Sequence, residues 1–596
     1  MNKKLLRKKL ALMLATLKKK RPYYCEVEYL ESTGTQYIDT GFSIKQENTT
    51  VSLSFMPTVE WSTGVKNMGV AGSQTYNYSN WFSLSYKNID YYIGSTPTIF
   101  SKQAIVNQIN YAELSAVNGT STLIFNGDVS TSSYSGTTIS NSNIYLFDYS
   151  HGNSPSSPDM FIGRIYRANI KNGSTVVRDF IPVLDWDYVP CLYDKVSGQL
   201  FYNQGSGDFL YGREIHYVDY LESTGTQYID TGVVAKSGLS SVLDFEYTAL
   251  SGTASMLDAR SGNDRFYLCH TGKPSTTFFF YYGYGSAVQS STTPAVNTRY
   301  LVETSLASGS QSMKVNGTTI ASGSSSWTYN LGVNLYLFGM NYSTPQYLTS
   351  AKLYGCKIMD GDTLVRDYKP AIDENGVGFM FDRVSHTCFL NQGTGAFKYT
   401  AREVEYLEST GTQYIDTGVI GKTGLSINVK VSSTTIEDSN LIGATLGVGG
   451  NYTRFFMTYY NYKLRIGYGS YTDPVSVSSG TTYDFKWEAI KNTQALYVDG
   501  TKVYTGTNTN TYNTGLTMYL FGRHSVYDGS ETANKYCMTG KIYYCKIWDN
   551  GTLIRDFIPC YKDGTPGMYD KLNDVFYQNE GTGTFTCGRI LEKEYE

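Results

Sequence analysis

Six aspartates recur at matched places along this chain and are the first candidates for chemistry. Three stand in the phrase "YIDTG", namely Asp39, Asp230 and Asp416. Three stand between an aromatic and a basic residue, namely Asp194, Asp382 and Asp570. Such carboxylates could pair for hydrolysis or ligate a hard cation. Aspartate before a turn or at a strand end also forms local hydrogen bonds, and we favour this structural role.

Tyrosine and tryptophan clusters offer a second kind of chemistry, the stacking of sugar rings on exposed aromatic faces. They occur in "QTYNYSNWF", "FFFYYGYG" and "FFMTYYNYKL". The candidate ligand-binding residues are Tyr76, Tyr78, Trp81, Tyr281, Tyr282, Tyr284, Tyr459, Tyr460 and Tyr462. The alternative is that these residues fill a core and cover a sheet. A variable aromatic segment on a repeated frame is nonetheless where we expect binding.

The elements that must position these residues come in three copies. The phrase "YLESTGTQYIDTG" occupies 29–41, 220–232 and 406–418 without a change. From the Asp of "YIDTG" to the Asp of a later "RD" the separations are 140, 137 and 140 residues. Such constant spacing predicts three homologous domains at 25–213, 214–402 and 403–596. The short linkers "REIHYVD" and "AREVE" predict that the domains abut.

Within each copy the local patterns favour β-structure. Apolar and polar residues alternate in "TVSLSFMP" and "INVKVSS", as in half-buried strands. Each copy also carries a two-residue turn that tolerates positive φ, at Asn126-Gly127, Asn316-Gly317 and Asp499-Gly500. Many short strands with regular turns predict an all-β sandwich or jelly roll.

The third copy carries motifs that resemble a known family. The strings "ALYVDGTKVYTG", "YLFGRHS" and "MTGKIYYCKIWDNGTLI" are similar to those of LamG-like, concanavalin A-like jelly-roll domains. Copies 1 and 2 match less well, since "GRIYRANIKNG" has no Trp and Met359 replaces it in "AKLYGCKIMDG". The resemblance implies tandem jelly rolls, as in surface proteins of gut bacteria and their phages. It also implies possible calcium at a rim; no other cofactor is expected.

Catalytic patterns are absent from the sequence. Laminarinase-like enzymes with this jelly roll carry Glu-x-Asp-x-x-Glu, because nucleophile and acid stand about 5 Å apart, and that string does not occur. The nearest acidic groups are Glu437-Asp438 and Glu488. There is no Ser/His/Asp order, nucleophile elbow or phosphate-binding glycine loop. We predict no enzymatic activity.

The net charge and the spacing of the cysteines argue against several further functional classes. The net charge is −3, which argues against specific nucleic-acid binding by the body of the protein. Nine cysteines are spread without a CxxC pair. They are typical of isolated thiols, not of a disulfide framework or a zinc site, and favour folding in a reducing compartment.

The N-terminal segment, residues 1–24, stands apart. Its first 21 residues hold nine Lys or Arg and no acid. Leu6, Leu10, Met13 and Leu17 form an amphipathic helical stripe. The apolar run is too short for a secretory signal or a membrane span. We expect a basic helix that anchors the chain to an anionic membrane surface, nucleic acid or a docking groove.

These observations favour a non-enzymatic fibre or decoration protein on the surface of a phage particle. Its partners would be a capsid or tail protein, bound through the N-terminal segment, and cell-surface or mucus glycans, with a homo-oligomer possible. Three linked copies would strengthen weak binding. The alternatives are an adhesin or carbohydrate-binding protein at the bacterial cell surface or outside the cell and, less favoured, a polysaccharide-degrading enzyme.

Overall fold

The structure is a computed structural model. It describes residues 21–44, 48–60, 69–74, 81–85, 90–94, 96–99, 103–134, 140–155, 160–250, 252–272, 279–284, 288–307, 309–324, 328–531 and 537–591. These ranges contain β-strands and no helix, which confirms the all-β prediction. None of the described segments is a helix with the length and apolar character that a membrane span requires. Residues 1–20 of the predicted N-terminal anchor, with Leu6, Leu10, Met13 and Leu17, lie outside the described residues. The last residues of that segment belong to copy 1 instead, because Tyr23 and Tyr24 are buried.

Copy 1 consists of two sheets. The larger sheet contains β1 (Cys25–Val27), β2 (Leu30–Thr33), β4 (Thr49–Pro57), β9 (Asn110–Val117), β10 (Thr120–Phe125), β11 (Asp128–Ser133), β15 (Ile162–Asn172), β16 (Thr175–Leu184), β17 (Pro190–Asp194), β18 (Gln199–Phe201) and β19 (Leu210–Tyr211). The smaller contains β3 (Ile38–Ser43), β5 (Gly69–Gln74), β6 (Trp81–Ser85), β7 (Asp90–Gly94), β8 (Thr96–Ile99), β12 (Asn143–Leu146), β13 (Tyr149–His151) and β14 (Ser154–Pro155).

Copy 2 repeats this arrangement. Its larger sheet contains β20 (Glu214–Tyr217), β21 (Leu221–Thr224), β23 (Leu239–Tyr247), β28 (Arg299–Ala307), β29 (Ser310–Val315), β30 (Thr318–Gly323), β34 (Ser350–Asp360), β35 (Thr363–Ile372), β36 (Gly378–Asp382) and β37 (Thr387–Leu390). The smaller contains β22 (Ile229–Lys236), β24 (Ala254–Ser261), β25 (Asp264–Gly272), β26 (Phe279–Tyr284), β27 (Val288–Gln289), β31 (Asn330–Leu337), β32 (Met340–Tyr342) and β33 (Thr344–Gln346). The short β38 (Lys398–Tyr399) follows.

Copy 3 has the same two sheets. The larger contains β39 (Arg402–Glu403), β40 (Leu407–Thr410), β42 (Leu425–Ser433), β47 (Thr482–Glu488), β48 (Gln494–Val498), β49 (Thr501–Gly506), β53 (Thr539–Asp549), β54 (Thr552–Lys562), β55 (Thr565–Asp570), β56 (Val575–Tyr577) and β57 (Thr586–Cys587). The smaller contains β41 (Ile415–Lys422), β43 (Ser439–Val448), β44 (Asn451–Tyr460), β45 (Lys463–Tyr468), β46 (Ser470–Ser476), β50 (Asn513–Leu520), β51 (His524–Tyr527) and β52 (Ser530–Glu531).

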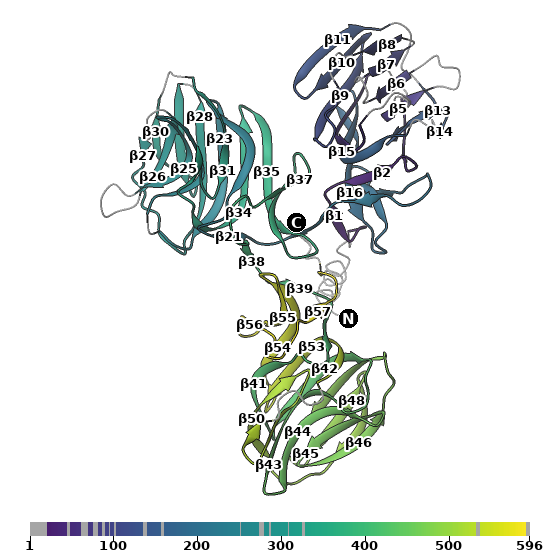
Figure 1. The fold of residues 1–596 in the computed structure, drawn as a ribbon, viewed down its shortest axis with the longest axis vertical. Helices are drawn as coiled ribbons and strands as arrows, with labels where there is room; N and C mark the ends of the chain where they lie inside the picture. Colours follow the sequence, from purple (N-terminus) through teal and green to yellow (C-terminus); the bar gives the residue numbers. More distant parts are fainter. Residues whose placement is uncertain are drawn as a thin grey trace, which may run out of the picture. The chain divides into compact units, whose positions relative to one another are not determined.

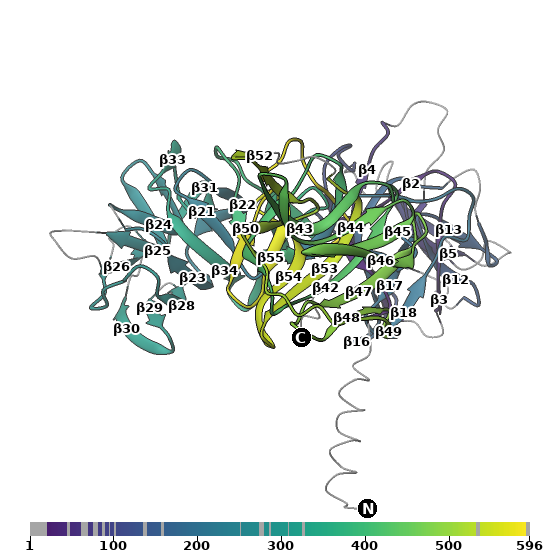
Figure 2. The same ribbon diagram turned by 90° about the horizontal axis from the view of Figure 1, so that it is seen from below.

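In each copy the two sheets form a sandwich, because strand alternation gives each sheet one apolar face. In copy 3, Val429 and Val431 of β42 and Phe455 and Met457 of β44 join one buried core. Figure 1 labels both strands. The strands β42, β53, β54 and β55 lie side by side in that order (Figure 2). The period-two patterns therefore predicted which residues face inward.

The predicted hairpin turns are confirmed by their backbone angles. The first turn residues Asn126, Asn316 and Asp499 have φ of 49°, 50° and 49°. The glycines that follow have φ of 91°, 80° and 80°. Positive φ at both positions is the signature of a type I′ turn, which matches the twist of the strands it joins.

The repeated phrase is built around its glutamine. Gln36 is buried, and its Oε1 accepts hydrogen bonds from Thr33 N at 2.8 Å and Ser32 Oγ at 3.1 Å. Gln227 and Gln413 accept the same pair of bonds in the other copies. Thr35 Oγ1 donates to the carbonyl of Ser206, in the glycine-rich turn that ends the copy. The phrase thus needs these residue types for internal contacts.

The chain divides into two compact units. One contains Met1–Asp373 and Gly378–Gly395, and the other contains Glu374–Val377 and Ala396–Glu596. Copies 1 and 2 thus share a unit, in which the linker "REIHYVD" supplies β20. This strand pairs with β1, with Glu26 opposite Ile215 and Val27 opposite Glu214. The linker is therefore a strand that joins the larger sheets of these copies. The finer domain limits stay a prediction.

Candidate functional site

The recurrent aspartates have structural partners. In "YIDTG" the carboxylate accepts a hydrogen bond from the glycine two residues on, as Asp39 Oδ1 does from Gly41 N at 2.8 Å. The second set is fully buried, and Asp194 Oδ1 accepts from Asp179 N at 2.8 Å in a pattern that Asp382 and Asp570 repeat. These bonds match the structural role that we favoured. Calcium stays an expectation from the resemblance alone.

Strand β44 gives the strongest candidate for binding. Its sequence, "NYTRFFMTYY", alternates between two surfaces. Phe455, Met457 and Tyr459 face the core of copy 3. The intervening residues Tyr452, Arg454, Phe456, Thr458 and Tyr460 line a pocket on the opposite, outer face of the smaller sheet.

Neighbouring strands of that sheet complete the pocket. Arg465 comes from β45, Tyr471 from β46 and Tyr527 from β51, while Arg523 immediately precedes β51. The pocket has a volume of about 380 Å³. It is also lined by Asp438, Asn440 and Thr445. We call it the Arg–Tyr pocket; its lining carries three guanidinium groups and one carboxylate, a balance of two positive charges.

Arginines and aromatic rings stack against one another in the Arg–Tyr pocket. Arg465 Cζ lies 3.7 Å from the ring centre of Tyr460 and 4.2 Å from that of Tyr471. Arg454 Cζ lies 4.5 Å from the ring centre of Tyr452. Such cation–π contacts hold long side chains in place and keep their N–H groups available at the ring edges.

Arg465 and Arg454 differ in their electrostatic partners. Arg465 forms a two-bond ion pair with Asp473, with N–O distances of 2.6 and 2.8 Å. This contact holds the pKa of Asp473 below its usual range. Arg454 donates one hydrogen bond, to the carbonyl of Gly469 at 3.3 Å, and has no ion pair with any described residue. The Arg454 guanidinium is therefore better able than that of Arg465 to pair with an anionic ligand.

A buried hydroxyl on the pocket wall has spare bonding capacity. The Thr445 side chain is 2% exposed, and its Oγ1 has no hydrogen-bond partner among the described residues. Such a group is costly when left unpaired, and a ligand hydroxyl or a water molecule would satisfy it. Aromatic faces, guanidinium groups and this hydroxyl are together suited to a sugar ring that carries an acidic group.

The structure separates the aromatic residues predicted from sequence. Tyr460 lines the Arg–Tyr pocket, and Tyr462 is 55% exposed but outside its lining. Tyr281 is partly buried and donates to Gln289 Oε1 at 3.1 Å. Three rings are buried and present no face to solvent, namely Tyr282, Tyr284 and Tyr459. Tyr76, Tyr78 and the side chain of Trp81 lie outside the described part of the chain.

The smaller sheet of copy 2 carries a buried histidine on β25. There His270 is 6% exposed and stacks on Tyr267 at a centroid distance of 4.2 Å. Its Nδ1 lies 3.0 Å from Asp258 Oδ2 and 2.8 Å from Ser255 Oγ. Both partners contact the same ring nitrogen, whereas a catalytic triad needs them on opposite nitrogens. His270, Asp258 and Ser255 therefore form a buried polar network within the sheet.

Sequence reasoning missed the arginines of the Arg–Tyr pocket. It considered tyrosine clusters as runs and did not separate the two faces of the strand. Period-two alternation in "NYTRFFMTYY" would have placed Tyr452, Arg454 and Tyr460 on one side. The contributions of Arg465 and Arg523 depend on sheet order, which the sequence does not state.

Comparisons with known proteins add a fold-level likeness. No family model and no curated protein matches the chain. The LG1-3 region of the laminin alpha2 chain matches at 11% identity and a TM-score of 0.26, covering 95% of this chain and 100% of that chain. Domains LG4-5 of the mouse laminin alpha1 chain match at 15% identity and a TM-score of 0.23, covering 57% and 92%. Both are laminin LG domains, the kind of domain that the copy 3 motifs resemble. The sandwich arrangement of this chain follows from its strand pairing and its buried cores.

Proposed function

We propose that this chain is a non-enzymatic binding protein that holds acidic carbohydrate in the Arg–Tyr pocket. The observation that carries the proposal is Arg454, a guanidinium stacked on Tyr452 without an ion-pair partner among the described residues. A carboxylate or sulfate on the sugar would pair with Arg454, and the sugar ring would lie against Tyr460 or Tyr471. Surface charge pairs are screened by salt, so binding should weaken as ionic strength rises.

The test compares two arginines in similar settings. Arg454→Gln removes the pocket guanidinium. Arg260→Gln is the control, because Arg260 also lies 4.5 Å from a tyrosine ring and donates to a glycine carbonyl, in copy 2. A charge-assisted hydrogen bond contributes about 1.5–3 kcal/mol, so Arg454→Gln should weaken binding of a uronic or sulfated oligosaccharide roughly 10- to 100-fold. Arg260→Gln should change it less than about twofold. Equal effects of the two substitutions would refute the proposal.

The alternative of polysaccharide degradation has a direct test. Incubation of the full chain with acidic and neutral polysaccharides should release no reducing sugar above background. Release that is lost in a Glu488→Gln or Asp438→Asn variant would favour the enzyme, and would place catalysis at the acidic groups that the sequence offers.

We further propose that the chain is displayed on a phage particle and is held there by residues 1–24. The basic, amphipathic sequence of this segment supports the idea. Arg21 itself contacts copy 1, since its carbonyl accepts a hydrogen bond from Trp186 Nε1 at 3.1 Å. Deletion of residues 2–20 should therefore leave the melting temperature unchanged and abolish incorporation into particles. Normal incorporation of the truncated chain would refute the anchor, and loss of export from a bacterial cell would favour the adhesin.

A further inference from the structure

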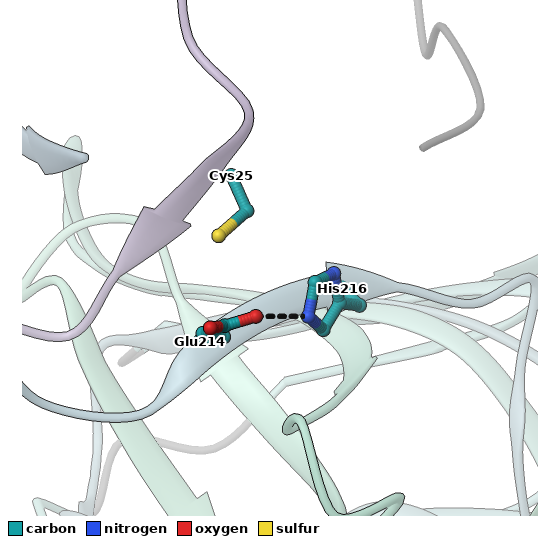
Figure 3. A group of neighbouring side chains, drawn as sticks. All are labelled: Cys25, Glu214 and His216. Carbon is teal, nitrogen blue, oxygen red and sulfur yellow. Dashed lines mark hydrogen bonds and ion pairs between the residues drawn. The ribbon is translucent and has the colours of Figure 1, made fainter. Parts of the chain in front are cut away.

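The junction of copies 1 and 2 brings together three metal-ligating side chains from two strands. Cys25 lies on β1, and Glu214 and His216 lie on β20 (Figure 3). Residues two apart on a strand point to the same face, so Glu214 and His216 share one side of β20. The register of the pairing, Val27 opposite Glu214, continues to place Cys25 opposite His216. A thiol, a carboxylate and an imidazole thus converge although Cys25 is far from the other two in sequence.

The donor atoms are close enough to share one ion. One ligand atom of each of the three residues lies within 4.8 Å of the others. His216 Nε2 lies 2.8 Å from Glu214 Oε2. A metal bonded to each atom at about 2.0–2.3 Å would leave these atoms about 3–4 Å apart. The nitrogen and oxygen would therefore separate slightly from their present 2.8 Å when the ion binds.

We propose that Cys25, Glu214 and His216 form a Zn²⁺ site that ties β1 to β20. Thiolate and imidazole ligands favour Zn²⁺ over Ca²⁺ or Mg²⁺, which prefer oxygen. Three protein ligands and one water would complete a tetrahedral shell. On binding, the Cys25 S–H bond breaks, an S–Zn bond forms and the proton passes to solvent. His216 keeps its one ring proton on Nδ1, so that Nε2 can bind the metal.

The surroundings suit a structural role. Cys25 and His216 are fully buried, and the ring of Tyr24 lies 5.8 Å from that of His216. Burial limits exchange of the ion with solvent. The ion would lie where two short strands, each paired over few residues, hold copy 1 to copy 2. Zn²⁺ should therefore stabilise this junction in particular.

The experiment uses the full chain and Co²⁺ as a spectroscopic probe for Zn²⁺. The wild-type protein should take up one equivalent, with a sulfur-to-cobalt charge-transfer band and the visible bands of tetrahedral Co²⁺, and Zn²⁺ should displace it. Cys25→Ser should lose the charge-transfer band. Cys191→Ser is the control, since Cys191 is an equally buried thiol of copy 1 on β17; it should keep the band.

A second variant keeps the test decisive if Cys25→Ser does not fold. Glu214 is only partly buried, so Glu214→Gln should fold, retain the sulfur-to-cobalt band and bind Zn²⁺ at least tenfold more weakly. Absence of the band in the wild-type protein would overturn the proposal. Wild-type Zn²⁺ affinity in Glu214→Gln, or a retained band in a folded Cys25→Ser variant, would overturn it as well.

Discussion

At the turn between β36 and β37, copy 2 places His386 where copies 1 and 3 have Gly198 and Asp574. All three residues adopt positive φ, at 59°, 71° and 55°. The His386 ring is buried, and its Nε2 lies 3.0 Å from the carbonyl of Val27 in copy 1. Burial, reinforced by the charge of Lys195, lowers the pKa of His386 to about 3. The histidine is therefore neutral in the folded chain at ordinary pH.

This depressed pKa predicts an acid-sensitive contribution to stability. The unfolded chain binds a proton at His386 below about pH 6.5, whereas the folded chain does so only near pH 3. The stability that neutral His386 contributes to the folded chain is fully present above pH 6.5 and is lost as the pH falls toward 3. Urea unfolding at several pH values should show wild-type stability falling more steeply than that of His386→Asn, by up to about 1.4 kcal/mol per pH unit.

Buried glutamates at the same junction change the stability in the opposite direction as the pH rises. Burial raises the pKa of Glu26 and Glu28, so their contribution is lost as the pH rises through the folded pKa. Both are present in wild type and in His386→Asn, and their effect cancels in the difference. Parallel pH profiles for the two proteins would contradict the assignment to His386.

Gly540 gives a second prediction at the scale of one residue. Its φ is 150°, and an added Cβ would lie 2.3 Å from the carbonyl oxygen of Ser432. Gly540→Ala should therefore cost about 2–4 kcal/mol through strain and overlap. Copy 2 has Ala351 at the matched place, and Ala351 is not one of the described residues with positive φ. Ala351→Gly should therefore lower the free energy of unfolding by only about 1 kcal/mol. Chemical denaturation measures both, and a small cost for Gly540→Ala would contradict the steric argument.

At the scale of elements, β44 assigns opposite roles to adjacent tyrosines. Tyr459 is 1% exposed and belongs to the core, whereas Tyr460 is 41% exposed and lies under Arg465. Tyr459→Ala should lower the free energy of unfolding by about 3 kcal/mol or more, as for other large buried rings.

Tyr460→Ala should instead cost less than about 1 kcal/mol, the scale of an exposed cation–π contact, and should weaken binding of acidic oligosaccharide. Thermal unfolding and titration calorimetry separate the two effects. If Tyr460→Ala destabilises as much as Tyr459→Ala, the assignment of faces on β44 is wrong.

The elements also show which features of the fold and the pocket could be predicted from the sequence. Local signals were sufficient for the hairpins, because Asn316-Gly317 specifies its turn without help from distant residues. Alternation was sufficient for the core positions of β42. The Arg–Tyr pocket was not predictable, because Arg454 and Arg465 meet only through the pairing of β44 with β45. The same is true of Cys25 and His216, whose contact depends on a linker that becomes a strand.

At the scale of the whole molecule, the two compact units predict two unfolding transitions. Copies 1 and 2 should unfold together, since β1 pairs with β20 and Cys388 N donates to Glu28 at 3.0 Å. Leu353→Ala, at a fully buried position of β34, should cost about 2–5 kcal/mol. It should also speed hydrogen exchange in β4 of copy 1.

The matched control for this coupling is Ile542→Ala, at the same place in copy 3 and also fully buried. It should lower the other calorimetric transition and leave exchange in β4 unchanged. If Leu353→Ala leaves the rate of hydrogen exchange in β4 unchanged, copies 1 and 2 unfold independently.

The internal bonds of the repeated phrase bear on how the chain is made. Thr35 can bond to Ser206 only after Ser206 has been synthesised, and the second phrase begins 14 residues later, at Tyr220. During translation the first phrase can therefore close its own sandwich before an identical competitor leaves the ribosome. Refolding from denaturant removes this order and offers each glycine-rich turn three identical phrases at once. Synthesis in order therefore favours the correct pairing within each copy. Refolding lacks this order, and repeated domains are then prone to exchange strands.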